Sequence, residues 1–294
     1  MQHRRKRRRL GCLVLTVAIV AMFTVSSVVK DALQHFASPY NSESVFVYNL
    51  SDQVEVINIQ GDKKRAPASL VKIATVYASL QHLEDLSVSA PVDQASYELA
   101  VRNDLAMAGF VPGERTTYRD LLYGTILASG GEAANALATN VAGSSELLVP
   151  DMNRLAKELG LRNTRFTNVE GRDEFGQWMS ARDIAYLTEA ALQNGHFRVL
   201  FTTSTFTTSN TSVHPSGIRL EHSVFSKVNL APGSDFRILG GKSGTTKKAG
   251  LCWVVLAEKA GKQYVIVTMG CPYDDINNPG DGHIQDTLRI LRDL

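Results

Sequence analysis

Cysteine is scarce in this sequence of 294 residues, which contains only Cys12, Cys252 and Cys271. So few cysteines exclude a framework of several disulfides. Cys252 and Cys271 flank a predicted hairpin, so one bridge between them is conceivable. We favour the alternative that both are small buried side chains, a common state of a free cysteine.

Recognisable zinc and nucleotide motifs are also lacking. The seven histidines show no His-Glu-x-x-His pattern and no paired-ligand spacing, which argues against a zinc peptidase. We expect His214 and His222 to be surface residues. Residues 241–243 (Gly-Lys-Ser) resemble the end of a phosphate-binding loop, but Phe236 stands where that loop needs its first glycine. No Gly-x-Ser-x-Gly nucleophile elbow is present either.

The basic charge of the chain is confined to its start. Residues 4–9 are all Arg or Lys, whereas the whole chain has 31 basic and 29 acidic residues. Without these six residues, 25 basic residues remain against 29 acidic ones, a net charge of −4. The rest of the chain therefore lacks the basic footprint of a nucleic-acid-binding protein, and we expect no nucleic acid partner.

A long apolar run follows this basic segment. Residues 10–29 contain no charged residue and are long enough to cross a bilayer as a helix. Positive charge on the N-terminal side favours a cytoplasmic start and export of the remainder. We favour an uncleaved membrane anchor over a cleaved signal peptide, because no clear cleavage site follows. The predicted organisation is a cytoplasmic segment (1–9), an anchor (10–29), a spacer (30–43) and one exported domain (44–294), secreted if the signal is cleaved.

Hydrophobic patterning predicts strands at both ends of the exported domain and helices between them. The expected strands are 44–50, 54–60, 251–258 and 263–269, and the expected helices are 68–83, 121–141 with a break at 129–131, 152–159, 181–193 and 284–294. Residues 202–212 are either a strand or a surface loop. Two terminal strand groups in one sheet, with a helical insert, predict a single α+β unit.

Ser69 and Lys72 form the first of three short motifs suited to catalysis. Pro67 and Ser69 are typical of a helix start, and residues three apart share a helix face, so the Lys72 amine can reach the Ser69 hydroxyl. A serine hydroxyl is a weak nucleophile until a base takes its proton. Lysine can be that base when burial and nearby positive charge lower its pKa. Alone, the pattern also fits a capping serine and a surface lysine.

The second and third motifs follow at 129–131 (Ser-Gly-Gly) and 242–245 (Lys-Ser-Gly-Thr). A serine between helices can pass protons between the first motif and a leaving amine, although a plain helix break is the alternative. The third motif stands at the predicted entry to an apolar strand. A lysine, a hydroxyl and a glycine at a strand edge can bind a carboxylate and align a peptide. A polar turn ahead of a strand is its alternative interpretation.

The order of these motifs matches the Ser-x-x-Lys, Ser-x-Asn and Lys-Thr-Gly set of penicillin-binding proteins and class A β-lactamases. The chain resembles the low-molecular-weight penicillin-binding D-alanyl-D-alanine carboxypeptidases of peptidase family S11, from about Ser44 to about Tyr273. The matching blocks are 66–72, 113–114, 120–124, 158–164, 166–168, 180–183, 241–246 and 249–250. The resemblance implies an α+β, serine β-lactamase/transpeptidase-like fold, in which an antiparallel sheet is flanked by helices and joined to a helical lobe.

The resemblance also implies the chemistry of the first two motifs. Ser69 would attack the carbonyl between two D-alanines and form an acyl-enzyme, with Lys72 as its base. Ser129 would relay the proton to the departing D-alanine. The implied partners are peptidoglycan pentapeptides that end in D-Ala-D-Ala, and β-lactams that acylate Ser69. No metal or organic cofactor is expected.

The third motif would bind the substrate. Lys242 and Ser243 would hold the terminal carboxylate, and Gly244 would let the strand approach closely. The backbone N–H groups of Ser69 and Thr245 would form the oxyanion hole.

Two departures from the family pattern keep alternatives open. Gly131, a predicted substrate-binding position, replaces the asparagine that contacts the substrate amide, and Asn135 is a candidate to compensate. Ser243 replaces the common threonine but keeps the hydroxyl. The alternatives are a β-lactamase or D,D-transpeptidase of the same fold, or a non-catalytic muropeptide-binding protein. Glu170 could suggest the deacylation base of a β-lactamase, but residues 168–173 fit the carboxypeptidase pattern better.

Overall fold

The computed structural model describes residues 38–228, 230 and 233–294. The chain divides into two units, Met1–Tyr40 and Asn41–Leu294, and the fold described below belongs to the second. The predicted cytoplasmic segment and anchor lie outside the described residues. Within the part of the chain that is described, no helix has the length and apolar character needed to cross a membrane.

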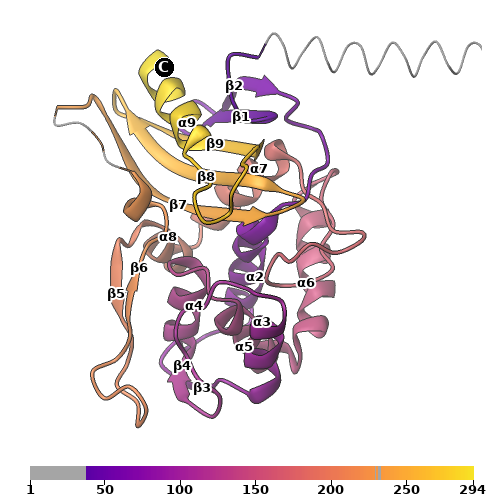
Figure 1. The fold of residues 1–294 in the computed structure, drawn as a ribbon, viewed down its shortest axis with the longest axis vertical. Helices are drawn as coiled ribbons and strands as arrows, with labels where there is room; N and C mark the ends of the chain where they lie inside the picture. Colours follow the sequence, from indigo (N-terminus) through magenta and orange to yellow (C-terminus); the bar gives the residue numbers. More distant parts are fainter. Residues whose placement is uncertain (1–37, 229, 231–232) are drawn as a thin grey trace, which may run out of the picture. The chain divides into compact units, whose positions relative to one another are not determined.

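An antiparallel sheet of five strands, in the order β2-β1-β9-β8-β7, forms one layer of the second unit (Figure 1). Strand β1 pairs with β9, so the two ends of the predicted exported domain meet in one sheet. The predicted α+β arrangement is therefore confirmed. The strands are β1 (Ser44–Asn49), β2 (Val54–Ile59), β7 (Phe236–Thr246), β8 (Gly250–Lys259) and β9 (Lys262–Cys271).

Most of the remaining elements form a helical lobe against the β7 side of the sheet (Figure 1). All residues of its central helix α2 except Tyr77 are buried, and helices that are apolar all round are typically core helices. The helical segments are η1 (Ala68–Leu70), α2 (Val71–Leu80), α3 (Gln94–Arg102), α4 (Tyr118–Ile126), α5 (Gly131–Ala142), α6 (Ser145–Glu158), α7 (Ala181–Leu192), α8 (Gly195–Thr202), η2 (Phe225–Lys227) and α9 (Gly282–Asp293). Two short hairpins pair β3 (Ser89–Pro91) with β4 (Arg115–Thr117) and β5 (Thr205–Thr207) with β6 (Arg219–Glu221).

Helices α7 and α9 cover opposite faces of the sheet. Tyr186 of α7 packs edge-on against Phe46 of β1, and His283 of α9 packs edge-on against Trp253 of β8. Side chains alternate between the faces along a strand, and Trp253 shares its face with Val45, the neighbour of Phe46. Burial on both faces explains why β8 and β9 are nearly continuous apolar runs. Cys252 and Cys271 are free and buried there, as favoured from the sequence.

The third motif lies inside a strand. The prediction that residues 242–245 stand at the entry to an apolar strand is wrong, because they belong to β7 and a turn separates them from β8. Strand β7 is the edge of the sheet, where polar and glycine residues are tolerated because one side of the ladder has no partner strand. Helix α6 also begins earlier than predicted, because Ser144 caps it by accepting a hydrogen bond from the Leu147 N–H at 3.2 Å.

The first two described residues of the second unit are fixed to its last helix. Asp286 of α9 accepts hydrogen bonds from the backbone N–H groups of Asn41 and Ser42, at 2.9 and 2.7 Å. The Ser42 hydroxyl donates a third, at 2.6 Å. These two residues were predicted to be spacer, yet the compact unit already includes them.

The turn before Ser69 is held from two sides. Ala68 has a left-handed backbone, with φ of 49°, which is uncommon for a residue with a Cβ. Gly171 approaches it so closely that a Cβ on Gly171 would overlap the Ala68 carbonyl group. From β7, a Cβ on Gly244 would lie 2.8 Å from the Ser69 nitrogen. These two glycines let the loop and the strand fix the position of Ser69.

The Gly171→Ala substitution tests this fixation. The added methyl group would displace the Ala68 carbonyl, so we expect a free energy of unfolding lower by at least ~2 kcal/mol than in Gly160→Ala. Gly160 is a matched control, since it has a similarly positive φ of 70° but no heavy atom within 4 Å of its Cβ position. Urea unfolding of both variants measures the difference. Equal losses in the two variants would show that the contact with Ala68 does not constrain the fold.

Candidate active site

Lys72 lies one helical turn after Ser69 and is buried against it. Its Nζ donates hydrogen bonds to Ser69 Oγ at 3.0 Å and to the Glu170 carbonyl oxygen at 2.6 Å. Burial lowers the pKa of Lys72 to about 8, while the carboxylates of Glu170 and Glu132 act in the opposite direction. A lysine with such a pKa is partly neutral near physiological pH, and a neutral amine at this distance can accept the Ser69 proton.

Ser129 and Lys242 form a second buried pair. Lys242 reaches out of β7, and its Nζ donates to Ser129 Oγ and to the Ser243 carbonyl oxygen, both at 2.8 Å. Burial lowers the pKa of Lys242 well below its ordinary value, and the positive charge of Lys72 adds to that effect. Among the described residues, no hydrogen bond joins Ser129 to Ser69 or to Lys72. The predicted relay through Ser129 is therefore not a direct contact in this structure.

The other residues of the third motif lie along the same edge strand. Residues 242 and 244 alternate with 243 and 245, so Lys242 and Gly244 share the face of β7 that meets the helical lobe. Ser243 Oγ donates to Ser223 Oγ at 3.0 Å, and Thr245 lies opposite Leu251 of β8. The structure thus places Gly244 against the start of α2 and Lys242 beside Ser129, while Ser243 and Thr245 lie on the other face of β7.

Two residues near Lys242 and Ser243 were not predicted to belong to the site. Ser223 joins the Ser243 hydroxyl to the end of α4 through its own N–H, which donates to the Leu127 carbonyl at 3.0 Å. A lone serine after a hairpin gives no sequence signal. His222 was expected at the surface, which is wrong, because it is only 1% exposed. Burial, and then the nearby Lys242 charge, lower the pKa of His222 to about 4, so this imidazole is neutral at pH 7.

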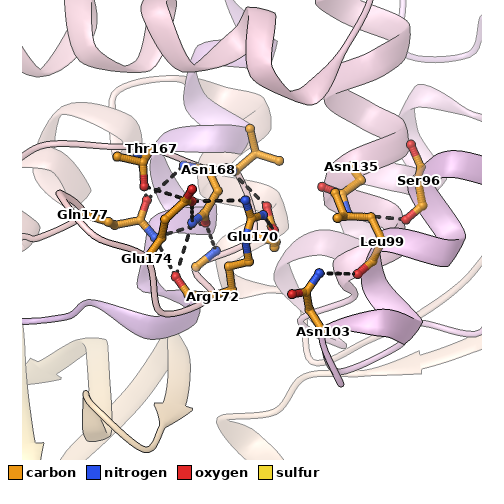
Figure 2. A network of polar contacts seen from close by, with 12 residues as sticks. Ser96, Leu99, Asn103, Asn135, Thr167, Asn168, Glu170, Arg172, Glu174 and Gln177 are labelled. Carbon is orange, nitrogen blue, oxygen red and sulfur yellow. Dashed lines mark hydrogen bonds and ion pairs between the residues drawn. The ribbon is translucent and has the colours of Figure 1, made fainter.

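Gly131 opens α5 beside a leucine side chain. A Cβ on Gly131 would lie 2.6 Å from Leu105 Cδ1 and 2.7 Å from Leu105 Cβ. Leu105 therefore occupies the space into which the side chain of an asparagine at position 131 would project. The Nδ2 of Asn135, the candidate to compensate, donates to the Ser96 carbonyl of α3 at 3.4 Å (Figure 2).

A network of polar contacts supports the Glu170 carbonyl that holds Lys72 (Figure 2). The Glu170 side chain is 1% exposed and forms an ion pair with Arg172, which also contacts Glu174 at 3.1 Å. Asn168 Oδ1 accepts the Gly171 N–H at 2.8 Å. This loop therefore places the carbonyl oxygen and the buried carboxylate of Glu170 close to Lys72.

Glu132 is the second buried carboxylate near Lys72. Its Oε1 accepts the backbone N–H groups of Ala108 and Gly109, at 2.6 and 2.9 Å. Burial raises the pKa of Glu132, against the effect of these hydrogen bonds. The described residues include no group of three or more His, Cys, Asp or Glu side chains placed to hold a metal ion.

A serine beside a buried lysine, under the edge strand of an antiparallel sheet, is the site that the resemblance predicts for peptidase family S11. The chain belongs to this family, because the family model described as "D-alanyl-D-alanine carboxypeptidase" matches residues 41–272.

Particular relatives agree with this assignment. The chain is 34% identical over 222 residues to D-alanyl-D-alanine carboxypeptidase DacC of Escherichia coli, covering 73% of this chain and 53% of that protein. It is 26% identical over 265 residues to D-alanyl-D-alanine carboxypeptidase DacF of Bacillus subtilis, and the match covers 90% of this chain and 66% of that protein. The chain thus spans half to two thirds of the length of these relatives.

A solved structure confirms the predicted fold. The crystal structure of the Streptomyces K15 DD-transpeptidase superimposes with a TM-score of 0.75 at 23% sequence identity. The match covers 87% of this chain and 99% of that one. The serine β-lactamase/transpeptidase-like fold was therefore predicted correctly.

Acylation by penicillin should depend on pH through Lys72. The base must be neutral, so the second-order rate constant of acylation should rise about tenfold per pH unit at low pH and level off above about pH 8. In Glu170→Gln the levelling should move to lower pH, because the Glu170 charge raises the pKa of Lys72. Mass spectrometry of the adduct between pH 5 and 10 measures both profiles. A flat profile, or one that falls with pH, would exclude Lys72 as the base.

Replacing Gly131 by asparagine should expose the role of Leu105. We expect Gly131→Asn alone to slow acylation by about 10²-fold, because the new side chain overlaps Leu105 and shifts the start of α5 next to Ser129. Adding Leu105→Ala makes room and should recover most of that loss, which stopped-flow acylation kinetics can measure. Leu105→Ala alone is the control. If the double variant is as slow as Gly131→Asn, then Leu105 is not the obstacle.

Proposed function

We propose that this protein is a serine D-Ala-D-Ala carboxypeptidase that removes the terminal D-alanine from peptidoglycan stem peptides through an acyl-enzyme. The observation that carries the proposal is the 3.0 Å hydrogen bond between Lys72 Nζ and Ser69 Oγ, made by a lysine that burial brings to a pKa of about 8. That pair is a nucleophile with its base, which is the minimum that acyl transfer requires.

The first step is attack on the peptide carbonyl. Lys72 takes the Ser69 proton, and Ser69 Oγ bonds to the carbonyl carbon of the penultimate D-alanine. The backbone N–H groups of Ser69 and Thr245 stabilise the negative oxygen of the tetrahedral intermediate. The amine of the terminal D-alanine leaves with the proton that Lys72 took from Ser69, passed on through Ser129. Water then hydrolyses the ester, one of its protons returns to Ser69 Oγ, and its hydroxyl group stays on the released acyl product.

The terminal carboxylate of the substrate has its own binding residues in this mechanism. Lys242 and Ser243 bind it at the edge of β7. Because Lys242 is fully buried and its pKa is lowered, an arriving carboxylate raises that pKa and draws a proton onto the amine. Recognition of the free C-terminus is thereby coupled to proton uptake.

A D,D-transpeptidase is the second candidate. The solved structure with the TM-score of 0.75 is named a DD-transpeptidase, and the same acyl-enzyme can pass its acyl group to an amine instead of water. A β-lactamase is less well supported, since the Glu170 carboxylate is already engaged by Arg172 and by the Val169 N–H at 3.1 Å. A non-catalytic muropeptide-binding protein would have no need for the Ser69–Lys72 pair.

The location proposed for the protein follows from its sequence. Residues 10–29 would anchor it in the cell membrane, with residues 44–294 as an extracytoplasmic catalytic domain. Its partners there are wall peptides ending in D-Ala-D-Ala and β-lactams.

The decisive experiment exposes the purified protein first to benzylpenicillin and then to a peptide ending in D-Ala-D-Ala. We expect a penicilloyl adduct on Ser69 by tandem mass spectrometry, release of D-alanine from the peptide, and neither in Ser69→Ala. An added amine acceptor that diverts product from hydrolysis would favour the transpeptidase. An adduct without any consumption of peptide would favour the binding protein, and no adduct in a folded sample would exclude all the acyl-enzyme functions.

A further inference from the structure

The hydroxyl group of Ser243 is oriented by a residue outside the three sequence motifs. Ser243 is only 8% exposed, and its Oγ donates a hydrogen bond to Ser223 Oγ at 3.0 Å. Within the described part of the chain, neither of these two hydroxyl groups makes another hydrogen bond. The orientation of the Ser243 side chain therefore depends on Ser223.

A serine in this position needs such a contact more than a threonine would. A serine side chain has three staggered rotamers, and its hydroxyl points in a different direction in each. A threonine is stiffer, because two heavy atoms on its Cβ restrict χ1. Ser243 stands where the family pattern has threonine. The residue at this position therefore lacks a restriction of its own.

The segment that carries Ser223 is fixed beside β7. The Ser223 N–H donates to the Leu127 carbonyl at 3.0 Å, and the Val224 N–H donates to Nδ1 of the buried His222 at 3.1 Å. Val224 is fully buried, and one of its methyl carbons lies 3.1 Å from the position that a Cβ on Gly241 would take. Ser223 Oγ is therefore an acceptor with a fixed position at the strand.

The contact between the two serines lies next to the contact between Lys242 and Ser129. Ser243 directly follows Lys242, and Leu127 precedes Ser129 by two residues. Lys242 Nζ is bonded to Ser129 Oγ at 2.8 Å. Both residues proposed to bind the terminal carboxylate are thus held by serines, one that follows α4 and one, Ser223, that is bonded to the end of α4.

We infer that Ser223 is a positioning residue, which holds the Ser243 hydroxyl in the orientation that binds the substrate carboxylate. The two hydroxyl groups carry two protons between them, and hydroxyl protons can rotate. When a carboxylate accepts the Ser243 proton, the Ser223 hydroxyl turns and donates to Ser243 Oγ. The two oxygens then stay together, and the chain of hydrogen bonds strengthens the bond to the carboxylate. This inference rests on the proposed function, which places the carboxylate at Ser243.

The test compares acylation by benzylpenicillin with acylation by its methyl ester, which has no free carboxylate. We expect Ser223→Ala to lower the second-order rate constant about tenfold with benzylpenicillin, the size of effect expected for a hydrogen bond to a charged group. The rate constant with the methyl ester should not change. Acylation by benzylpenicillin should still level off above about pH 8 in this variant, because Lys72 is not affected. Stopped-flow kinetics measures these rate constants.

A second substitution assigns the effect to the orientation of Ser243. In a Ser243→Thr background, Ser223→Ala should lower the rate constant with benzylpenicillin by less than about twofold, because the threonine restricts its own hydroxyl. Ser226→Ala is the matched control. Ser226 belongs to the same segment, but its side chain is exposed, so both rate constants should stay at the parent values. Thermal unfolding of each variant checks that it is folded.

The outcomes separate this inference from the function on which it rests. The role of Ser223 would be overturned if Ser223→Ala acylated like Ser226→Ala, or if it lost as much rate with the methyl ester as with benzylpenicillin. An undiminished loss in the Ser243→Thr background would overturn it as well. In each of these cases the parent protein still forms a penicilloyl adduct. A parent protein that forms no adduct would instead overturn the proposed function.

Discussion

Two lysine ammonium groups are buried close together where β7 meets the start of α2, and the properties of the site depend on that arrangement. Moving a charged amine out of water is costly unless it is paired, so each lysine loses part of its affinity for protons. The hydrogen-bond partners of Lys72 and Lys242 are neutral oxygens of serine side chains and backbone carbonyls. As a result the pKa values of both amines are lowered, and that of Lys72 falls to about 8, where the amine can accept the Ser69 proton.

Neighbouring carboxylates limit how far burial lowers the pKa of Lys72. Glu170 and Glu132 are buried carboxylates that moderate the lowered pKa of Lys72. Each is held in place by its own loop, Glu170 by Arg172 and Glu132 by the N–H groups of residues 108–110. Left-handed backbone at Ala68 and Ser129 places both motif serines, and such strain commonly persists at functional sites because the surroundings enforce it.

The sequence was informative where physical patterns are local or repeated. Strands β1, β8 and β9 were predictable because they are buried apolar runs, and Ser69 and Lys72 were predictable because a helix brings positions three apart together. Contacts between residues far apart in the sequence could not be predicted. Nothing local indicates that Leu105 fills the space beside Gly131, that Ser223 reaches Ser243, or that His222 is buried under β7. The strand containing residues 242–245 was missed because an edge strand lacks the apolar pattern of its neighbours.

The most direct test of the account is an NMR titration of the lysine side chains. In protein labelled with ¹³C and ¹⁵N at lysine, the Nζ signals of Lys72 and Lys242, assigned by Lys→Arg variants, should titrate well below the ordinary pKa of 10.5, with Lys72 near 8. If Lys72 and Lys242 titrate at or above the ordinary lysine pKa of 10.5, the two amines are not held in a desolvated site, and Lys72 cannot be the base that activates Ser69.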